Sequence, residues 1–151
     1  MSLSNLKHVP QIMAVMTPFP YSIGIDEPIV KAHEMMAGQD IRHLPVKDHG
    51  DLVGVISERD VRVATEKGAV ATAGGTLRVR DVYLPEAYVV DVSERLDSVL
   101  LHMARHHIGS ALVVKEDRLA GIFTNTDACR LLGGWLRERF PVSPDNGHDA
   151  A

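Results

Sequence analysis

The heptapeptide GVISERD, residues 54–60, returns later in the chain as GIFTNTD, residues 121–127. Each copy begins with a glycine and two β-prone residues, and each ends with a hydroxyl residue three positions before an aspartate. β-Branched and aromatic residues favour strands, whereas Ser or Thr followed three residues later by an acid is typical of a helix start. Both stretches are therefore predicted to pass from a strand into a helix.

The duplication extends well beyond these seven residues. An ungapped shift of 67 positions places residues 15–64 on residues 82–131 with eleven identities. The identities include residues with strong local effects on the backbone, namely Pro18 with Pro85, Gly54 with Gly121 and Asp60 with Asp127. Such self-similarity at a fixed period indicates two copies of one structural unit.

Each copy has the same predicted order of strand, helix, two strands and helix. The predicted strands are residues 21–25, 44–47 and 52–56 in the first copy, and residues 88–92, 111–114 and 119–123 in the second. In the second copy, apolar residues from Leu96 to Ala104 recur at helical spacing. Asp26 and Ser93 are predicted N-caps, and the last helices are predicted to begin near Glu58 and Asn125. The last helix of the second copy has a predicted packing stripe, with a kink at the glycine pair 133–134; the stripe is Leu131, Leu132, Trp135 and Phe140.

The fold class predicted from this order is mixed α/β (α+β), with two β-α-β-β-α repeats related by a pseudo-twofold axis. Neither repeat is large enough to cover both faces of its sheet, so the two are expected to share a core. The predicted boundaries are residues 12–66 for the first repeat, 67–78 for a linker, 79–139 for the second repeat and 140–151 for a polar tail.

Composition restricts the partners and the compartment. The chain has a net charge of -4 and therefore lacks the dominant basic field that binding to nucleic acids or anionic membranes requires. We expect neither partner. Cys129 is the only cysteine, which excludes an intrachain disulfide and favours a reducing compartment. No leader-like segment and no apolar run of about 18 residues is present, so a cytoplasmic location is predicted.

In these motifs the chain resembles a tandem pair of cystathionine-β-synthase (CBS) domains, also called a Bateman module. The resemblance rests on VMTP at residues 15–18, RHLPV at 42–46 and GVISERD at 54–60, and on a second copy with Val82, GIFT at 121–124 and Asp127. The resemblance covers roughly residues 12–138, and the chain is similar to a stand-alone member of bacterial type. The resemblance implies the paired β-α-β-β-α fold.

The resemblance also implies a function. Many members bind AMP, ADP, ATP or S-adenosylmethionine between their repeats and transmit the ligand state to an enzyme or transporter. We therefore expect a regulatory sensor that binds an adenosine-containing ligand, has no obligatory cofactor, forms a homodimer and regulates an unknown protein in trans. The alternative is a structural dimerisation module without a ligand. The sequence has no recognisable catalytic motif, so an enzyme is not expected.

Two interpretations apply to Ser57 with Asp60 and to Thr124 with Asp127. A hydroxyl followed by an acid forms a capping box, which stabilises a helix start by about 1 kcal/mol. By resemblance, the two aspartates accept hydrogen bonds from ribose hydroxyls, while Ser57 and Thr124 lie close to ribose and phosphate. The chemistry is suitable, because a carboxylate has two acceptor oxygens for a diol and a helix N-terminus favours phosphate. Both roles can coexist.

Arg42 and His43 are the predicted contacts to phosphate. The simpler interpretation is a solvated loop pair, but the resemblance places basic residues here against ligand phosphates, and Arg can bind phosphate with two hydrogen bonds. The second repeat has Gly109 and Ser110 at the matching positions. This difference argues against two equivalent polyphosphate sites.

The resemblance places Ser22, Ile23 and Val90 where family members contact adenine, largely through the backbone. Ordinary packing in a half-buried strand remains the alternative for each side chain. A metal site is not expected, although His102 and His106 lie four residues apart on one predicted helix, because no Glu or Cys completes a ligand set.

Overall fold

The computed structural model describes residues 2–66, 71–72 and 75–144. The first repeat contains β2 (Ile23–Gly24), α1 (Ile29–Gln39), β3 (His43–Asp48), β4 (Asp51–Ser57) and α2 (Glu58–Glu66). The second contains β7 (Val89–Asp91), α3 (Leu96–His106), β8 (Ser110–Lys115), β9 (Arg118–Thr124) and α4 (Asn125–Arg139). The predicted β-α-β-β-α order is confirmed in both repeats, and the last helices begin at Glu58 and Asn125 as expected.

Short elements precede the β-α-β-β-α unit of each repeat or lie between the repeats. They are the 3-10 helices η1 (Ile12–Ala14) and η2 (Val79–Asp81) and the two-residue strands β1 (Thr17–Pro18), β5 (Ala71–Thr72) and β6 (Gly75–Thr76). The predicted linker lies partly outside the described residues, and so does most of the predicted tail.

Each repeat has one sheet, and the two sheets are built alike. β2 pairs with β3 in parallel and β3 with β4 antiparallel, just as β7 pairs with β8 and β8 with β9. The register of the antiparallel pairs shifts between Val46 and Lys47 and again between Val113 and Val114, which are equivalent positions in the two repeats. The repeats therefore share even a local irregularity, which bends a strand and increases its twist.

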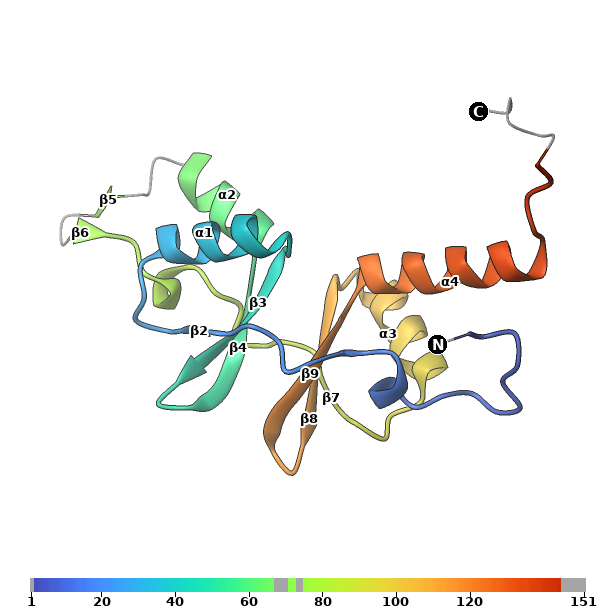
Figure 1. The fold of residues 1–151 in the computed structure, drawn as a ribbon. Helices are drawn as coiled ribbons and strands as arrows, with labels where there is room; N and C mark the ends of the chain where they lie inside the picture. Colours follow the sequence, from blue (N-terminus) through green and yellow to red (C-terminus); the bar gives the residue numbers. More distant parts are fainter. Residues whose placement is uncertain (1, 67–70, 73–74, 145–151) are drawn as a thin grey trace.

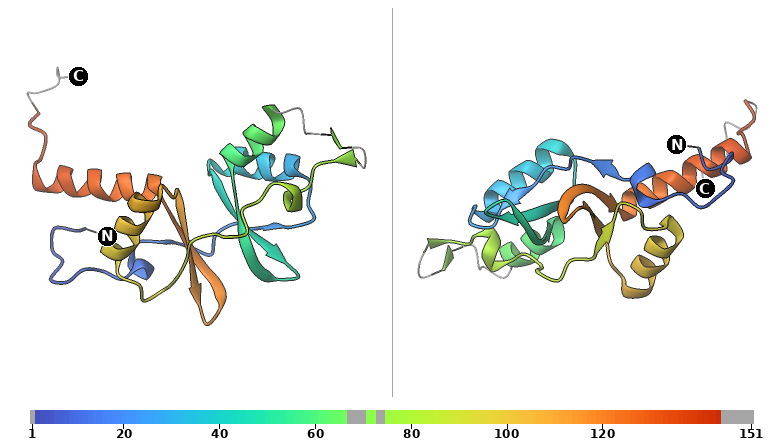
Figure 2. Two further views of the ribbon diagram at one scale, coloured as in Figure 1. Left: turned by 180° about the vertical axis from the view of Figure 1, so that it is seen from behind. Right: turned by 90° about the horizontal axis from the view of Figure 1, so that it is seen from below.

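The segment that leads into each repeat crosses to the sheet of the other one (Figures 1 and 2). β1 precedes the first repeat but pairs with β9 of the second, with Thr17 opposite Ile122. At the equivalent place, Leu84 pairs with Val55 of β4 through two backbone hydrogen bonds of 3.0 and 2.8 Å. This reciprocal exchange joins the two sheets.

Gly54 and Gly121 make this crossing possible. A Cβ at Gly54 would lie 2.2 Å from the Leu84 carbonyl oxygen, and a Cβ at Gly121 would lie 2.3 Å from Met16 Sδ. Real Cβ atoms do not approach other heavy atoms so closely, so a side chain at either position would force the leading segment or the Met16 side chain to move. The repeated glycine of GVISERD and GIFTNTD has a packing reason of its own.

The core is divided between the repeats and their interface. In the first repeat Met36, Leu44 and Ile56 are among the buried residues, and in the second Val99, Val113 and Phe123 are. A smaller cluster of Val55, Leu112 and Ile122 joins the two. In Figure 1 the β3–β4 and β8–β9 hairpins diverge toward their turns, while α2 and α4 start at the opposite end of the sheets.

The predicted N-caps Asp26 and Ser93 are wrong. α1 and α3 begin later, after Pro28 and Arg95, and neither has a side-chain cap. Instead, the first amide of α1 donates to the Leu77 carbonyl at 3.1 Å, and that of α3 donates to the Pro10 carbonyl at 2.9 Å. Leu77 and Pro10 are equivalent residues that precede the two repeats. Backbone carbonyls from distant segments thus accept hydrogen bonds from the first amides of these helices, which have no partner within the helix.

The packing stripe predicted on the last helix is correct only in part, because Leu131 packs against the core of the second repeat and Leu132 does not. Leu131, Leu132 and Trp135 were expected to pack against the repeat, with Phe140 beyond them and a kink at Gly133 and Gly134. α4 runs without interruption from residue 125 to 139 and contains no buried residue. Leu132 is 54% exposed and Phe140 67%, because the second half of α4 extends beyond the sheet (Figure 1).

Candidate functional site

The two helix starts present the same pair of side chains. In the first repeat the Ser57 amide donates to Asp60 Oδ2 at 2.9 Å, and the Asp60 amide donates to Ser57 Oγ at 3.1 Å. In the second the Thr124 amide donates to Asp127 Oδ2 at 2.8 Å, and the Asp127 amide donates to Thr124 Oγ1 at 3.3 Å. Both are complete capping boxes, so the capping interpretation is correct for both helices.

Capping leaves acceptor capacity on both carboxylates. Only Oδ2 of Asp60 receives a hydrogen bond within the described residues, and Asp60 is partly exposed. Oδ2 of Asp127 accepts from the Thr124 amide and hydroxyl, while its Oδ1 lies 3.4 Å from Arg130 Nη1. A carboxylate can accept about four hydrogen bonds. Each aspartate can therefore cap its helix and still accept hydrogen bonds from a bound diol.

His43 lies between the two repeats. It begins β3 and pairs across the sheet with Ser57, the first residue of the first capping box. Its ring faces Gly109 of the second repeat, where a Cβ would lie 3.1 Å from His43 Nε2. Burial lowers the pKa of His43, whereas the charges of Asp60 and Asp127 both act to raise it. One imidazole is thus within electrostatic reach of both capping carboxylates.

Arg42 is exposed next to the first helix start. Its carbonyl accepts from the Glu58 amide at 2.8 Å, and the Gly109 carbonyl accepts from the Asn125 amide at 3.1 Å in the second repeat. The guanidinium of Arg42 makes no hydrogen bond or ion pair within the described residues. Its charge is therefore free to meet an anion beside α2.

The residues predicted near adenine have different surroundings. Ile23 and Val90 are 3% and 7% exposed and belong to the cores of their repeats, whereas Ser22 is partly exposed. The side chains of Ile23 and Val90 pack inside the protein. Only the backbone of these two residues can offer a contact to a ligand.

Sequence reasoning missed Gly109 and Asn125 as parts of this site. Gly109 lacks the Cβ that would push against His43, and Asn125 Nδ2 lies 3.6 Å from that same Cβ position. The signal was present in the repeat alignment, because Gly109 replaces Arg42 and Asn125 replaces Glu58. Its meaning depends on the two repeats facing each other.

Other features of the described residues do not add to this site. His102 and His106 stack with ring centroids 4.3 Å apart, and His102 also stacks on Tyr88. Within the described ranges no group of three or more His, Cys, Asp or Glu residues could hold a metal ion. None of the helices in the described part of the chain is both long and apolar enough to cross a membrane.

Comparison with known protein families identifies the fold. The CBS domain model matches this chain twice, at residues 12–67 and 79–134. The hypoxic response protein 1 of Mycobacterium tuberculosis is 30% identical over 112 residues, which cover 73% of this chain and 76% of that protein. This chain belongs to the CBS domain family and carries two CBS domains in tandem.

A larger relative shows the same module within a longer protein. The L-aspartate semialdehyde sulfurtransferase of Methanocaldococcus jannaschii is 31% identical over 108 residues, or 70% of this chain. This chain spans only 20% of the length of that protein. The likeness therefore concerns one region of the sulfurtransferase.

Solved structures agree with the family. AcuB of Vibrio cholerae, named for acetoin utilization, has a TM-score of 0.75 and 25% identity, covering 91% of this chain and all of that one. The CBS domain pair of protein MJ0100 was solved with 5′-methylthioadenosine and S-adenosylmethionine. It has a TM-score of 0.72 and 25% identity, covering 84% of this chain and 98% of that one. CBSX2, solved with AMP, has a TM-score of 0.68 and 25% identity, covering 81% of this chain and 95% of that one.

Proposed function

We propose that this protein is a ligand-sensing regulatory module that binds an adenosine-containing molecule between its two CBS domains. The supporting observation is the pair of equivalent helix starts, Ser57 with Asp60 and Thr124 with Asp127, on either side of His43. Related CBS pairs were solved with AMP and with S-adenosylmethionine. In this proposal the aspartates bind the ribose hydroxyls, and Arg42 and His43 face the phosphate or its replacement.

The backbone of Ser22, Ile23 and Val90 would contact adenine in the proposed sites. Because Ile23 and Val90 have buried side chains, their substitution would disturb the core rather than test the contact. The two aspartates are better probes, since their side chains are partly exposed and their capping role is defined.

The test compares Asp60→Ala and Asp127→Ala with wild type by calorimetric titration of AMP, ATP and S-adenosylmethionine. Loss of a charge-assisted hydrogen bond weakens binding by about 10- to 150-fold. Asp81→Ala is a matched control, because Asp81 Oδ2 also accepts from a backbone amide, that of Arg78, at 2.9 Å outside the site. Asp81→Ala should leave the affinity unchanged.

The rival function is a structural module whose aspartates only cap helices. It predicts that both site variants lose about 1 kcal/mol of stability while any affinity stays at the wild-type value. No binding of any of the three compounds to the wild-type protein would also support the rival. Ligand-induced stabilisation gives a second readout, about 2.7 kcal/mol at 100 times the dissociation constant.

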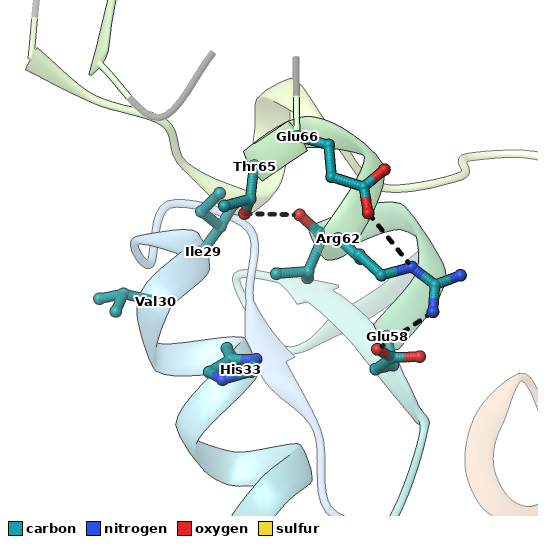
Figure 3. A pocket seen from close by; sticks show the side chains of 8 residues that line it. Ile29, Val30, His33, Glu58, Arg62, Thr65 and Glu66 are labelled. Carbon is teal, nitrogen blue, oxygen red and sulfur yellow. Dashed lines mark hydrogen bonds and ion pairs between the residues drawn. The ribbon is translucent and has the colours of Figure 1, made fainter. Parts of the chain in front are cut away.

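We also propose that the module forms a homodimer, in which helices of one copy contact the second copy. An apolar groove of about 460 Å³ lies between α1 and α2 and is lined in part by Ile29, Val30 and Val61 (Figure 3). At its edge Arg62 is 3.9 Å from Glu58 and 4.0 Å from Glu66. Val30 is 53% exposed in the single chain, so a second copy would cover apolar surface here.

The remaining parts of the proposal concern activity and location. We propose that the chain has no catalytic activity of its own, needs no obligatory cofactor and passes its ligand state to another protein in the cytoplasm. Discrimination among ligands would come from the charged end of the ligand, and the output from a population shift between arrangements of the two repeats.

A further inference from the structure

The two halves of the proposed site differ in positive charge. The first repeat supplies Arg42 and His43, and the second has Gly109 and Ser110 at the equivalent positions. Each repeat supplies one capping aspartate at its last helix start. The first repeat also has Glu58 at the start of α2, where the second has the uncharged Asn125. A pseudo-symmetric pair of sites therefore contains an unsymmetric set of cations.

His43 occupies the space that this difference creates. A Cβ at Gly109 would approach His43 Nε2 to 3.1 Å, so a larger residue there would displace the ring. The ring thus reaches across from the first repeat to the backbone of the second, beside the start of α4. The imidazole is partly buried, and no hydrogen bond to its nitrogens is present within the described residues.

The charges around His43 come from both repeats. Asp60 at the start of α2 and Asp127 at the start of α4 favour the protonated ring, whereas Arg42 on its own strand disfavours it. Asn125, from the same helix start as Asp127, is uncharged. Burial is the largest effect and lowers the pKa of His43, which favours the neutral ring before a ligand binds.

We infer that His43 is a single imidazole shared by both halves of the site, and that it takes up a proton when an anionic group binds beside it. This inference rests on the proposed function, because the anion is taken to be the phosphate of a nucleotide. A phosphate adds negative charge close to a ring on which the charges of Asp60 and Asp127 already act. Protonation then supplies a positive charge beside Gly109 and Ser110, where the second repeat has no counterpart of Arg42 or His43.

Proton uptake has a direct thermodynamic consequence. The affinity for a nucleotide must fall as the pH rises, by up to tenfold per pH unit for one proton taken up. Uncharged adenosine lacks the phosphate, so its affinity should change little over the same range. The module would then read both the nucleotide and the proton concentration.

The experiment is calorimetric titration of AMP and adenosine at pH 7 in two buffers with different ionisation enthalpies. The apparent binding enthalpy differs between the two buffers in proportion to the number of protons taken up, so this difference measures that number. We expect uptake approaching one proton for AMP with the wild type, and much less with His43→Gln. The His43→Gln variant also corrects for protons taken up by the AMP phosphate, whose own pKa is about 6. His49→Gln is the matched control, since His49 is exposed in the β3–β4 turn.

A second variant tests the position of the ring without removing it. Gly109→Ala keeps the imidazole but pushes it a few tenths of an ångström away from the second repeat, so it should reduce proton uptake on AMP binding. Sharing is tested by the pKa of His43 measured by NMR in Asp60→Asn and Asp127→Asn. Each variant should lower the pKa, because each carboxylate raises it.

The outcomes separate this inference from the proposed function. AMP binding with equal proton uptake in wild type and His43→Gln would overturn the inference and leave the proposed function intact. A His43 pKa that responds to only one of the two aspartates would overturn the sharing. Absence of binding by AMP, ATP, adenosine and S-adenosylmethionine would overturn the proposed function, and the inference with it.

Discussion

Gly54→Ala is the substitution that tests the crossing of the two repeats most directly. An alanine Cβ at this position would lie 2.2 Å from the Leu84 carbonyl oxygen and 2.8 Å from Tyr83 Cδ2. The nearest atom belongs to the backbone, so it cannot turn away as a flexible side chain could. Relief of the clash requires the segment at Leu84 to move by about 1 Å away from β4.

The cost follows from what this movement breaks. Val55 and Leu84 exchange two backbone hydrogen bonds of 3.0 and 2.8 Å, and each contributes about 0.5–1.5 kcal/mol. Overpacking adds about 1–3 kcal/mol. We expect Gly54→Ala to lower the free energy of unfolding by about 3 kcal/mol, which corresponds to a fall in Tm of about 6–12 °C for a chain of this size.

Substitutions at two other glycines provide a milder case and a control for this prediction. Gly121→Ala should cost less, about 1–2 kcal/mol, because its nearest neighbour is the flexible Met16 side chain and the backbone oxygen of Thr17 is 3.0 Å away. Gly38→Ala is the control. It lies in α1 with no atom within 4 Å of its Cβ position, so alanine should stabilise the helix by up to about 1 kcal/mol.

Urea unfolding followed by circular dichroism would measure all three variants against wild type. The expected order of stability is Gly38→Ala, wild type, Gly121→Ala and Gly54→Ala. A Gly54→Ala protein with the wild-type midpoint would refute the close crossing at Leu84. Equal losses for Gly54→Ala and Gly121→Ala would refute the distinction between a backbone and a side-chain neighbour.

Three further outcomes are expected. Arg42→Ala should weaken ATP binding more than adenosine binding in calorimetric titrations, and added salt should shrink the difference; equal effects on both would exclude a phosphate contact. Sedimentation equilibrium at tens of micromolar should show a species heavier than 16.5 kDa, whereas a purely monomeric protein would contradict the proposed homodimer. Burial lowers the pKa of His43, so the unfolded chain binds a proton more readily and stability falls as the pH drops below about 6.5. In His43→Gln that part of the pH dependence should be missing from urea midpoints at pH 7 and pH 5.

Much of the local structure was predictable because it depends on neighbouring residues. The hydroxyl–aspartate pairs located the starts of α2 and α4 at Glu58 and Asn125, and both capping boxes form as the sequence indicated. The repeat alignment predicted two like units, and even the register shifts of their sheets are equivalent. The helical spacing from Leu96 to Met103 correctly identified the buried face of α3.

The errors arose where distant segments replace local partners. Asp26 and Ser93 have typical cap chemistry, but the carbonyls of Leu77 and Pro10 meet the first amides of α1 and α3 instead. Leu131 of the predicted stripe on α4 packs against the core, but Leu132 is exposed because the helix extends past the sheet that would cover it. Periodicity shows that a face is apolar, and it does not show whether any surface lies against that face.

By itself, then, the sequence determined the duplication, the order of elements and the residue types at each helix start. Only the tertiary structure decided which repeat each leading segment joins and what His43 faces. A local motif is fixed by interactions within a few residues, such as the amide of Ser57 with Asp60. The contact of His43 with Gly109 spans 66 positions, and it exists because two folded units pack with their equivalent edges together.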